Sequence, residues 1–292
     1  MRALILRSTL LAVLAASTAA AQRDTAFTWS KKLPDGARLT IKNMNGPIDV
    51  RAASGDRVEV RAVVRAESRG NVSDVTFDVR ERASDDVEIC TVYRGSSNCD
   101  PDHSWNNVRV SVRYTIELPK SMRLRASTGN GDVSVTQTVA EVEASTGNGD
   151  VTIKESLGRV VGSTGNGDVT ITSARGPVKV SSGNGRIEAT TSRGPVDAST
   201  GNGDVDVKMA AVSADVGSMT FSTGSGSVRV TLPADFNGEL DASTGNGSVD
   251  TDFEIRVQGR LSSTRLRGAI GTGNGPLIKL RSGNGRLMVR KS

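Results

Sequence analysis

From about residue 121 onward, apolar and polar residues alternate in short stretches that are separated by glycine-rich turns. Between residues 142 and 154, apolar or small residues take every second position on both sides of a Gly-Asn-Gly-Asp turn at 147–150. A period of two is typical of a strand with one buried face. Glycine and asparagine accept the left-handed backbone conformations that sharp corners need. The pattern therefore predicts short strands joined by tight corners, and it shows no convincing long helix after the N-terminal segment.

The turn belongs to an internal repeat. Copies of Gly-Asn-Gly begin every 18 residues at Gly129, Gly147, Gly165, Gly183 and Gly201, and further copies begin at Gly245, Gly273 and Gly283, with a variant at Gly224. A nine-residue glycine period inside each unit indicates two strands and two corners per unit. Hairpins with Asn-Gly turns would give antiparallel strands, but identical units at fixed spacing favour parallel stacking. The prediction is an all-β, parallel β-solenoid with coils of about 18 residues and two strands per coil.

Stacking would place like residues above one another and bury continuous columns. One predicted column contains Val133, Val151, Val169, Ile187 and Val205, and a second contains Ala126, Ala144 and Ala198 with Gly162 and Val180 between them. The asparagines at the turns would form a ladder of side-chain amides with a structural role, namely Asn130, Asn148, Asn166, Asn184 and Asn202.

The pattern divides the chain into three parts. We expect residues 1–21 to be a signal peptide, 22–120 to form an N-terminal β cap and the first coils, and 121–292 to be the Gly-Asn-Gly solenoid that continues from it. Residues 39–50 repeat the strand–turn–strand pattern once, and longer alternating stretches at 58–64, 75–79, 87–92 and 108–116 predict cap strands. A cap is expected because an exposed first coil is a sheet edge that invites aggregation.

The first residues predict export. Arg2 and Arg7 precede the apolar run 10–16, which is too short to span a membrane, and Ala19-Ala20-Ala21 offers a cleavage site. No later stretch is apolar enough for a membrane span. Cleavage removes two of the 37 basic residues and lowers the formal charge from +5 to +3. The mature chain is expected outside the cytoplasm, in the periplasm, at the cell surface or in the medium.

Two cysteines, Cys90 and Cys99, occur in this exported chain. An even cysteine count in an oxidising compartment predicts a disulfide, which would close a short polar loop. Basic residues are spread along the chain and aromatics make up only 3 % of it. Because nucleic-acid binding needs a basic stripe and usually stacking aromatics, that class of partner is excluded.

The sequence also resembles a known family, the bacterial "putative adhesin" domain of exported proteins. The likeness is carried by the segment 116–119 leading into 124–131, by 232–253, and by 265–285, which ends in the pair Gly-Asn-Gly-Pro-Leu and Gly-Asn-Gly-Arg-Leu. It covers nearly all of the mature chain. The resemblance implies a β-solenoid in the cell envelope or outside it, and it brings no catalytic residues.

Calcium is the cofactor hypothesis that the repeat raises. Asp132, Asp150, Asp168 and Asp204 follow Gly-Asn-Gly and would stack along one edge, as carboxylates do in calcium-binding nonapeptide repeats. The aspartate, however, comes one position earlier than that repeat requires, and only alternate nine-residue halves carry it. A structural corner cap is the favoured interpretation, and calcium binding stays open. No other cofactor is expected.

The functional prediction is a non-enzymatic, adhesin-like solenoid that presents a polar surface to glycans or proteins of the cell envelope. One alternative is a structural or stress-related envelope module without a ligand, and another is a carbohydrate-active β-helix enzyme, which would need convergent acid–base groups. A flat threonine array for a regular surface begins at Ser134, Thr152 and Thr170 but is broken at Glu188. The candidate binding residues are Tyr93, His103 and Trp105, because the cysteine loop holds the unusual side chains.

Overall fold

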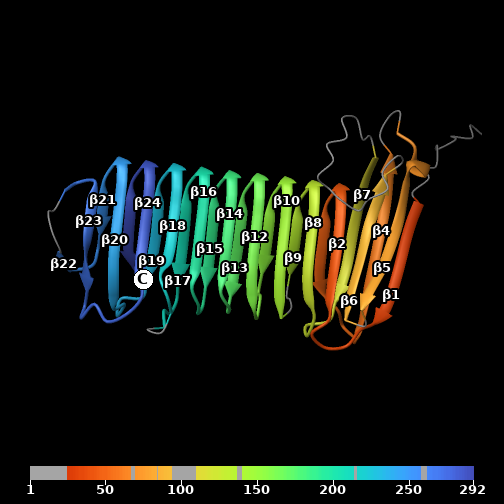
Figure 1. The fold of residues 1–292 in the computed structure, drawn as a ribbon, viewed down its shortest axis with the longest axis horizontal. Helices are drawn as coiled ribbons and strands as arrows, with labels where there is room; N and C mark the ends of the chain where they lie inside the picture. The colour runs from red at the N-terminus through yellow and green to blue at the C-terminus, as the bar shows by residue number, and fades with distance from the viewer. Residues whose placement is uncertain are drawn as a thin grey trace, which may run out of the picture.

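The computed structural model describes residues 25–66, 70–83, 85–93, 110–136, 140–213, 216–257 and 262–292. In this part of the chain, two long sheets run side by side along an elongated body (Figure 1). The fold is the predicted all-β solenoid with parallel sheets. The predicted signal peptide at 1–21, together with Cys99, His103 and Trp105, lies outside the described residues.

The twelve-stranded sheet contains, in spatial order, β1 (Thr25–Lys32), β4 (Arg57–Ala66), β7 (Val110–Leu118), β3 (Ile48–Ala52), β9 (Val133–Thr136), β11 (Val151–Lys154), β13 (Val169–Ala174), β15 (Ile187–Thr191), β17 (Val205–Met209), β19 (Val228–Leu232), β25 (Leu287–Lys291) and β21 (Val249–Thr251). The thirteen-stranded sheet contains β22 (Ile255–Val257), β23 (Arg265–Ile270), β20 (Gly238–Asn246), β24 (Leu277–Asn284), β18 (Met219–Ser225), β16 (Val196–Asn202), β14 (Val178–Asn184), β12 (Arg159–Asn166), β10 (Glu141–Asn148), β8 (Arg123–Asn130), β2 (Arg38–Asn45), β6 (Asp86–Tyr93) and β5 (Val75–Ala83). A single 3₁₀ turn, Val72–Asp74, precedes β5.

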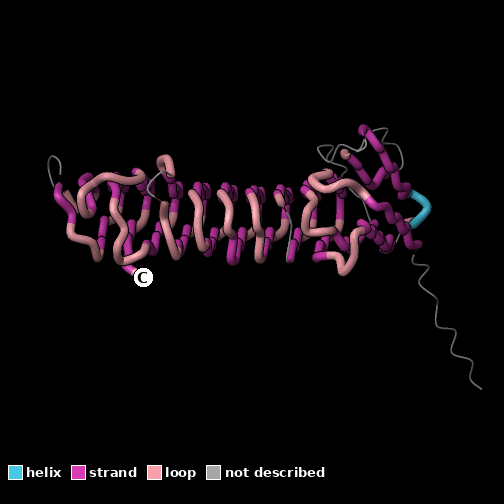
Figure 2. The backbone as a smooth tube through the Cα atoms, turned by 90° about the horizontal axis from the view of Figure 1, so that it is seen from below, coloured by secondary structure: helices cyan, strands magenta, loops and turns pink. Residues whose placement is uncertain are grey.

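Each central coil gives one strand to each sheet, and we call such a pair of strands a rung. The chain leaves the thirteen-stranded sheet through the Gly-Asn-Gly-Asp corner, the first corner, and returns through a second corner (Figure 2). The predicted valine column is confirmed, because Val151 pairs in parallel with Val133 and Val169, and the register continues through Ile187 to Val205. The predicted alanine column is also in register, from Ala126 to Ala198. Side chains from both columns are buried and fill the thin core between the sheets.

At the N-terminal end, neighbours in space are not neighbours in sequence. The rung made of β2 and β3 stacks directly on the rung made of β8 and β9. The segment between them forms the cap, in which β4 and β7 extend one sheet and β6 and β5 extend the other. The cap strands pair antiparallel at β1–β4, β4–β7 and β5–β6. The longer alternating stretches form strands where the structure describes them, and these strands continue both sheets.

The C-terminal end has an inversion that the sequence did not predict. The last rung, β24 with β25, lies between the β18–β19 rung and the β20–β21 rung. The copy of Gly-Asn-Gly that begins at Gly273 is not a corner of the solenoid, in contrast to the other copies. It lies in the connection between β23 and β24, where the side chain of Asn237 accepts a hydrogen bond from the Gly273 N–H at 3.0 Å. A copy only ten residues before the corner at Gly283 leaves no room for another coil.

In the described part of the chain, aromatic side chains pack against one another near the two ends of the core, and Phe221 in β18 is a further buried aromatic residue. Phe27 stacks on Phe77 at 4.5 Å in the cap, and Phe77 meets Tyr114 edge-on at 6.2 Å. At the other end Phe236 packs edge-on against Phe253 at 6.3 Å, with the Lys291 ammonium 5.1 Å from the Phe253 ring. These larger side chains cover the ends of a core that elsewhere consists mostly of small and branched aliphatic groups.

Candidate binding surface

Each first corner is fastened to the coil before it by a buried hydroxyl. The Thr146 hydroxyl donates to the carbonyl oxygen of Gly131 at 2.8 Å, and the Thr164 hydroxyl donates to Gly149 at the same distance. The same bond, at 2.8–3.0 Å, joins Thr128 to Gly46, Ser182 to Gly167, Thr200 to Gly185, Thr223 to Gly203, Ser282 to Gly226 and Thr244 to Gly285. A satisfied buried hydroxyl contributes about 1 kcal/mol, so the threonine of the repeat has a structural task.

The asparagines of the repeat lie in one ladder along the first corners. In each step the side-chain amide nitrogen donates to the amide oxygen of the preceding rung at 2.8–2.9 Å, through Asn130, Asn148, Asn166, Asn184 and Asn202. Ser225 takes the asparagine position in the next rung, and a further step joins Asn246 to Asn284 at 2.8 Å. The ladder ties corner to corner and uses the asparagine amides for structure.

The aspartates after the ladder also bond from rung to rung. One carboxylate oxygen of Asp132, of Asp150 and of Asp168 accepts the backbone N–H one coil further on, at 2.9, 2.8 and 2.7 Å. Asp204 accepts in the same way from the Ser227 N–H at 2.8 Å. Within the described ranges, no group of three or more His, Cys, Asp or Glu side chains is placed to hold a metal ion. Each aspartate therefore caps a corner. The oxygen that accepts the backbone N–H is one that a calcium ion would also need as a ligand.

We expect the thermal midpoint of the metal-stripped mature protein to stay the same when millimolar calcium is added. The reason is that one oxygen of each aspartate in the row already accepts a backbone N–H. The measurement is a melt after chelation, with and without calcium, and magnesium serves as the control cation. A specific site filled to 100 times its dissociation constant would add about 2.7 kcal/mol of stability, so a rise of several degrees with calcium alone would establish the aspartate row as a metal site.

The serine that precedes each threonine has no comparable bond. Six of these serines are aligned on the outer face of the thirteen-stranded sheet, where they form what we call the serine column: Ser127, Ser145, Ser163, Ser181, Ser199 and Ser222. Ser127 donates to the Ile41 carbonyl at 3.4 Å, whereas the other five hydroxyls make no hydrogen bond to any described residue. All six are partly or fully exposed. The column was not predicted, although its first five serines recur every 18 residues beside the threonines.

Charged groups border the serine column at both ends. Lys42 continues it at the cap, and Arg281 continues it after Ser222. Arg281 binds Asp241 at 2.9 Å, and this hydrogen bond holds the pKa of Asp241 below its usual value. On one side of the column lie the glycines of the first corners, which have no side chains. The result is a straight, shallow strip of hydroxyls that recur about every 4.8 Å, the spacing of paired strands.

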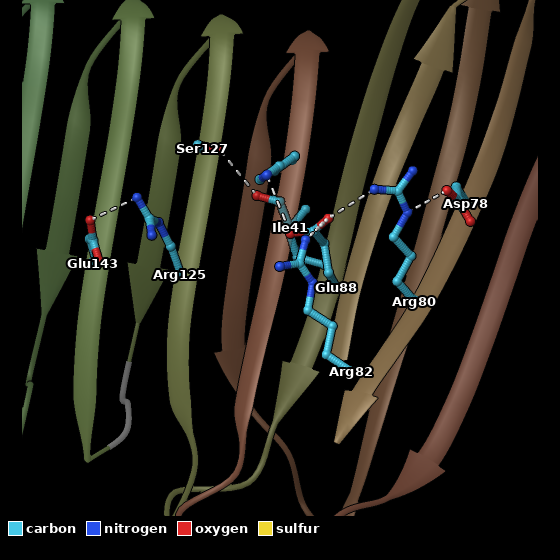
Figure 3. A network of polar contacts seen from close by, with 9 residues as sticks. Ile41, Asp78, Arg80, Arg82, Glu88, Arg125, Ser127 and Glu143 are labelled. Atoms are coloured by element: carbon cyan, nitrogen blue, oxygen red, sulfur yellow. Dashed lines mark hydrogen bonds and ion pairs between the residues drawn. The ribbon is translucent and has the colours of Figure 1, made fainter. Parts of the chain in front are cut away.

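The cap end of this face carries a polar network (Figure 3). The carboxylate of Glu88 is surrounded by Lys42 at 3.3 Å, Arg82 at 3.4 Å and Arg80 at 3.8 Å, and Arg80 also binds Asp78 at 2.7 Å. The Glu88 side chain is only 8 % exposed, whereas those of its three partners are 29–59 % exposed. The network joins three neighbouring strands, β2, β6 and β5, and leaves cationic groups at the surface.

Of the predicted loop residues, the structure describes Tyr93 and Cys90. Tyr93 is 4 % exposed and its hydroxyl donates to the Asn45 carbonyl at 3.5 Å. Burial raises the pKa of Tyr93 well above its ordinary value, and a ligand at the surface would reach little of its ring. Cys90 is fully buried in β6, and no cysteine in the described part is free. The predicted bond to Cys99 involves a residue outside that part and stays a prediction.

A hollow of about 420 Å³ lies on the opposite, twelve-stranded sheet at the cap. Thr28, Ser30, Arg51, Glu59, Arg61, Thr115 and Glu117 supply its polar lining. Register places Glu59 directly across from Glu117, which forms an ion pair with Arg51. The hollow lies on the face opposite the serine column.

One family model matches most of this chain, and several solved structures are similar to it. The model of the family described as Toastrack DUF4097 matches residues 36–285. Among solved structures, a "putative adhesin" from Parabacteroides merdae is 11 % identical to this chain. The alignment covers 91 % of this chain and 96 % of that protein, with a TM-score of 0.41. A "putative adhesin" from Bacteroides fragilis is 13 % identical with 92 % and 97 % covered and a TM-score of 0.40. A "putative cell adhesion protein" from Clostridium sporogenes is 12 % identical with 92 % and 100 % covered and a TM-score of 0.32.

A comparison with curated protein sequences gave no significant match. None of the residues that the structure describes forms a helix with the length and hydropathy of a membrane span.

Proposed function

This chain is a member of the Toastrack DUF4097 family, and from that premise we propose that it is an exported, non-enzymatic, adhesin-like protein that binds a polymer of the cell envelope. The partner we propose is an extended, hydroxyl-rich polymer such as a surface glycan. It would lie along the serine column, parallel to the long axis of the solenoid.

One observation supports this proposal most directly. In the repeat Ser-Thr-Gly-Asn-Gly-Asp, the threonine fastens the corner, the asparagine forms the ladder and the aspartate caps the next coil. The glycines allow the close approach of neighbouring coils. The serine recurs with the same regularity, but apart from Ser127 these serines make no side-chain hydrogen bond to a described residue. Their hydroxyls therefore remain available to donate and accept hydrogen bonds.

The geometry favours a long partner over a small one. Single hydroxyl contacts are weak because water competes for them. Six contacts along one column would act together, since binding at one rung raises the effective concentration of the polymer at the next. Specificity would then come from the match between the polymer repeat and the rung spacing, with Lys42 and Arg281 at the two ends of the strip.

The proposal predicts that blocking the serine column weakens polymer binding. In co-sedimentation with purified peptidoglycan sacculi and with insoluble surface polysaccharide, the triple change Ser145→Gln, Ser163→Gln, Ser181→Gln should raise the apparent dissociation constant about tenfold or more, a loss of about 1.4 kcal/mol. The matched control introduces glutamine at three aligned outward positions of three consecutive strands in the opposite sheet, with Ser134→Gln, Thr152→Gln and Thr170→Gln.

The possible outcomes separate the hypotheses. Loss of binding in the serine variant alone supports the proposed surface. Equal binding by both variants would remove the serine column as the site. A wild-type protein that sediments with neither polymer and stays monomeric with both would favour the alternative of a structural module, and a polymer shortened during the assay would favour an enzyme.

A further inference from the structure

The two long edges of the solenoid carry opposite charges. Four consecutive rungs each place an acid beside the first corner and a base beside the second corner. The acidic edge consists of Asp150, Asp168 and Asp204 in the corner row and of Glu188, two positions further along in β15. The basic edge consists of Arg175 and Arg193 in the second corners and of Lys154 in β11 and Lys208 in β17, on the strands that lead into them. All eight of these residues are exposed.

Each edge carries charges of almost only one sign. Arg186 is the one base among the four acids, and it approaches Asp204 at 4.0 Å. Glu155 is the one acid among the four bases. Each exception removes one unit, so the acidic edge carries −3 and the basic edge carries +3. Among the other charges near these corners, Arg159 pairs with Glu141 at 3.1 Å and Arg229 pairs with Asp206 at 3.7 Å. Lys179 and Asp197 lie opposite each other in register and cancel in charge.

The charges are available to a partner. Within the described residues, the side chains of the basic edge make no ion pair and no hydrogen bond. Asp150 and Asp168 use one oxygen for the next backbone N–H, and their other oxygen has no described partner. Both edges also share one repeat distance, because they belong to the same coils, which stack through parallel pairing.

We propose that a second copy of this chain binds along these edges, with the acidic edge of one copy against the basic edge of the next and their rungs in step. Two edges of equal length, equal spacing and opposite charge fit each other better than either fits an irregular partner. Contact between different edges of identical copies is heterologous, and copies that are related by translation with their rungs in step form open rows. Each contact is exposed and weak on its own, and the repeated contacts act together.

This inference does not depend on the proposed polymer. The serine column lies on the sheet face between the two edges, so lateral association leaves it uncovered. A row of copies would align many serine columns in parallel, and such an array would add multivalency to any binding on that face.

The test is sedimentation velocity of the full mature chain in low and high salt. The screening length is about 30 Å at 0.01 M and about 3 Å at 1 M ionic strength, so the wild type should associate in the first and be monomeric in the second. Two variants should stay monomeric in both: Arg175→Glu with Arg193→Glu, and Asp150→Asn with Asp168→Asn. The asparagine changes retain the oxygen that accepts the backbone N–H and remove only the charge.

A matched control carries the same charge change away from the edges. Arg61→Glu with Arg65→Glu lies on β4 in the cap, where both residues are exposed, and this variant should associate like the wild type. A wild type that is monomeric at low salt would overturn the proposal. So would edge variants that associate as the wild type does, or a cap variant that loses association equally.

Discussion

Replacing Gly149 by valine should lower the stability of the solenoid by about 3 kcal/mol, the upper part of the range for a residue held in a forbidden backbone region. Gly149 has a φ of +139°, which side chains of L-residues rarely adopt. A Cβ atom there would lie 2.4 Å from the carbonyl oxygen of Gly131 in the neighbouring coil. Both the conformation and the space therefore require glycine.

The corner cannot move away to relieve the clash without further losses. The Gly149 N–H donates to the Asn166 carbonyl at 2.9 Å, and the Gly149 carbonyl accepts the Thr164 hydroxyl at 2.8 Å. A shift of the Gly149 backbone would weaken both bonds. Since a loss of 1 kcal/mol lowers the thermal midpoint of a chain of this size by about 2–4 °C, the midpoint should fall by roughly 6–12 °C.

Two controls isolate the cause of that loss. Gly55→Val makes the same chemical change at a loop glycine where a Cβ atom would meet nothing within 4 Å. Thr152→Ser changes an outward position of the same coil, and such surface changes stay within about 0.5 kcal/mol. If Gly149→Val melted together with these two controls, Gly149 would not need its special backbone conformation.

The periodic part of the fold could be predicted because one residue type has one task at every rung. Val133 and Val151 occupy the same buried position of the repeat, 18 residues apart, and their pairing follows from that spacing. The structural roles of Asn148 and Asp150 at the corner could also be predicted, because stacking places equal side chains above one another. The serines recur at the same spacing, but the sequence does not distinguish a hydroxyl that fastens a corner from one that makes no hydrogen bond.

The order of the rungs at the ends could not be predicted in the same way. The strands at 277–291 have the same local pattern as any other rung, and nothing local says that they insert between β18 and β20. The choice depends on packing between distant segments, such as Leu280 between Phe221 and Ala242. Likewise, the opposite charge of the two edges becomes visible only when the corners are stacked, because along the sequence acids and bases are simply interspersed.

The second large effect is expected at the cap, where Glu88→Gln should destabilise the protein by about 2 kcal/mol. Removing one partner of a buried ion pair costs about 3–5 kcal/mol when the remaining charge has no access to water. Here Lys42, Arg80 and Arg82 are 29–59 % exposed, so water compensates them in part and the loss is smaller. The amide has nearly the shape of the carboxylate but cannot balance three cations that meet at one point.

Glu143→Gln is the matched control, because Glu143 lies on the outer face of the same sheet and pairs with Arg125 at 3.5 Å (Figure 3). That pair is 43–57 % exposed, so its loss should cost no more than about 1 kcal/mol.

The measurement is the free energy of unfolding from denaturation in urea, which leaves the ionic strength unchanged, at 0.05 M and 1 M sodium chloride. The loss in Glu88→Gln should shrink at high salt, since the repulsion among the three cations is then screened. Equal losses for both variants, independent of salt, would mean that Glu88 acts only as one more surface charge and that the cap is held to the first rung by its strand pairing and its aromatic core alone.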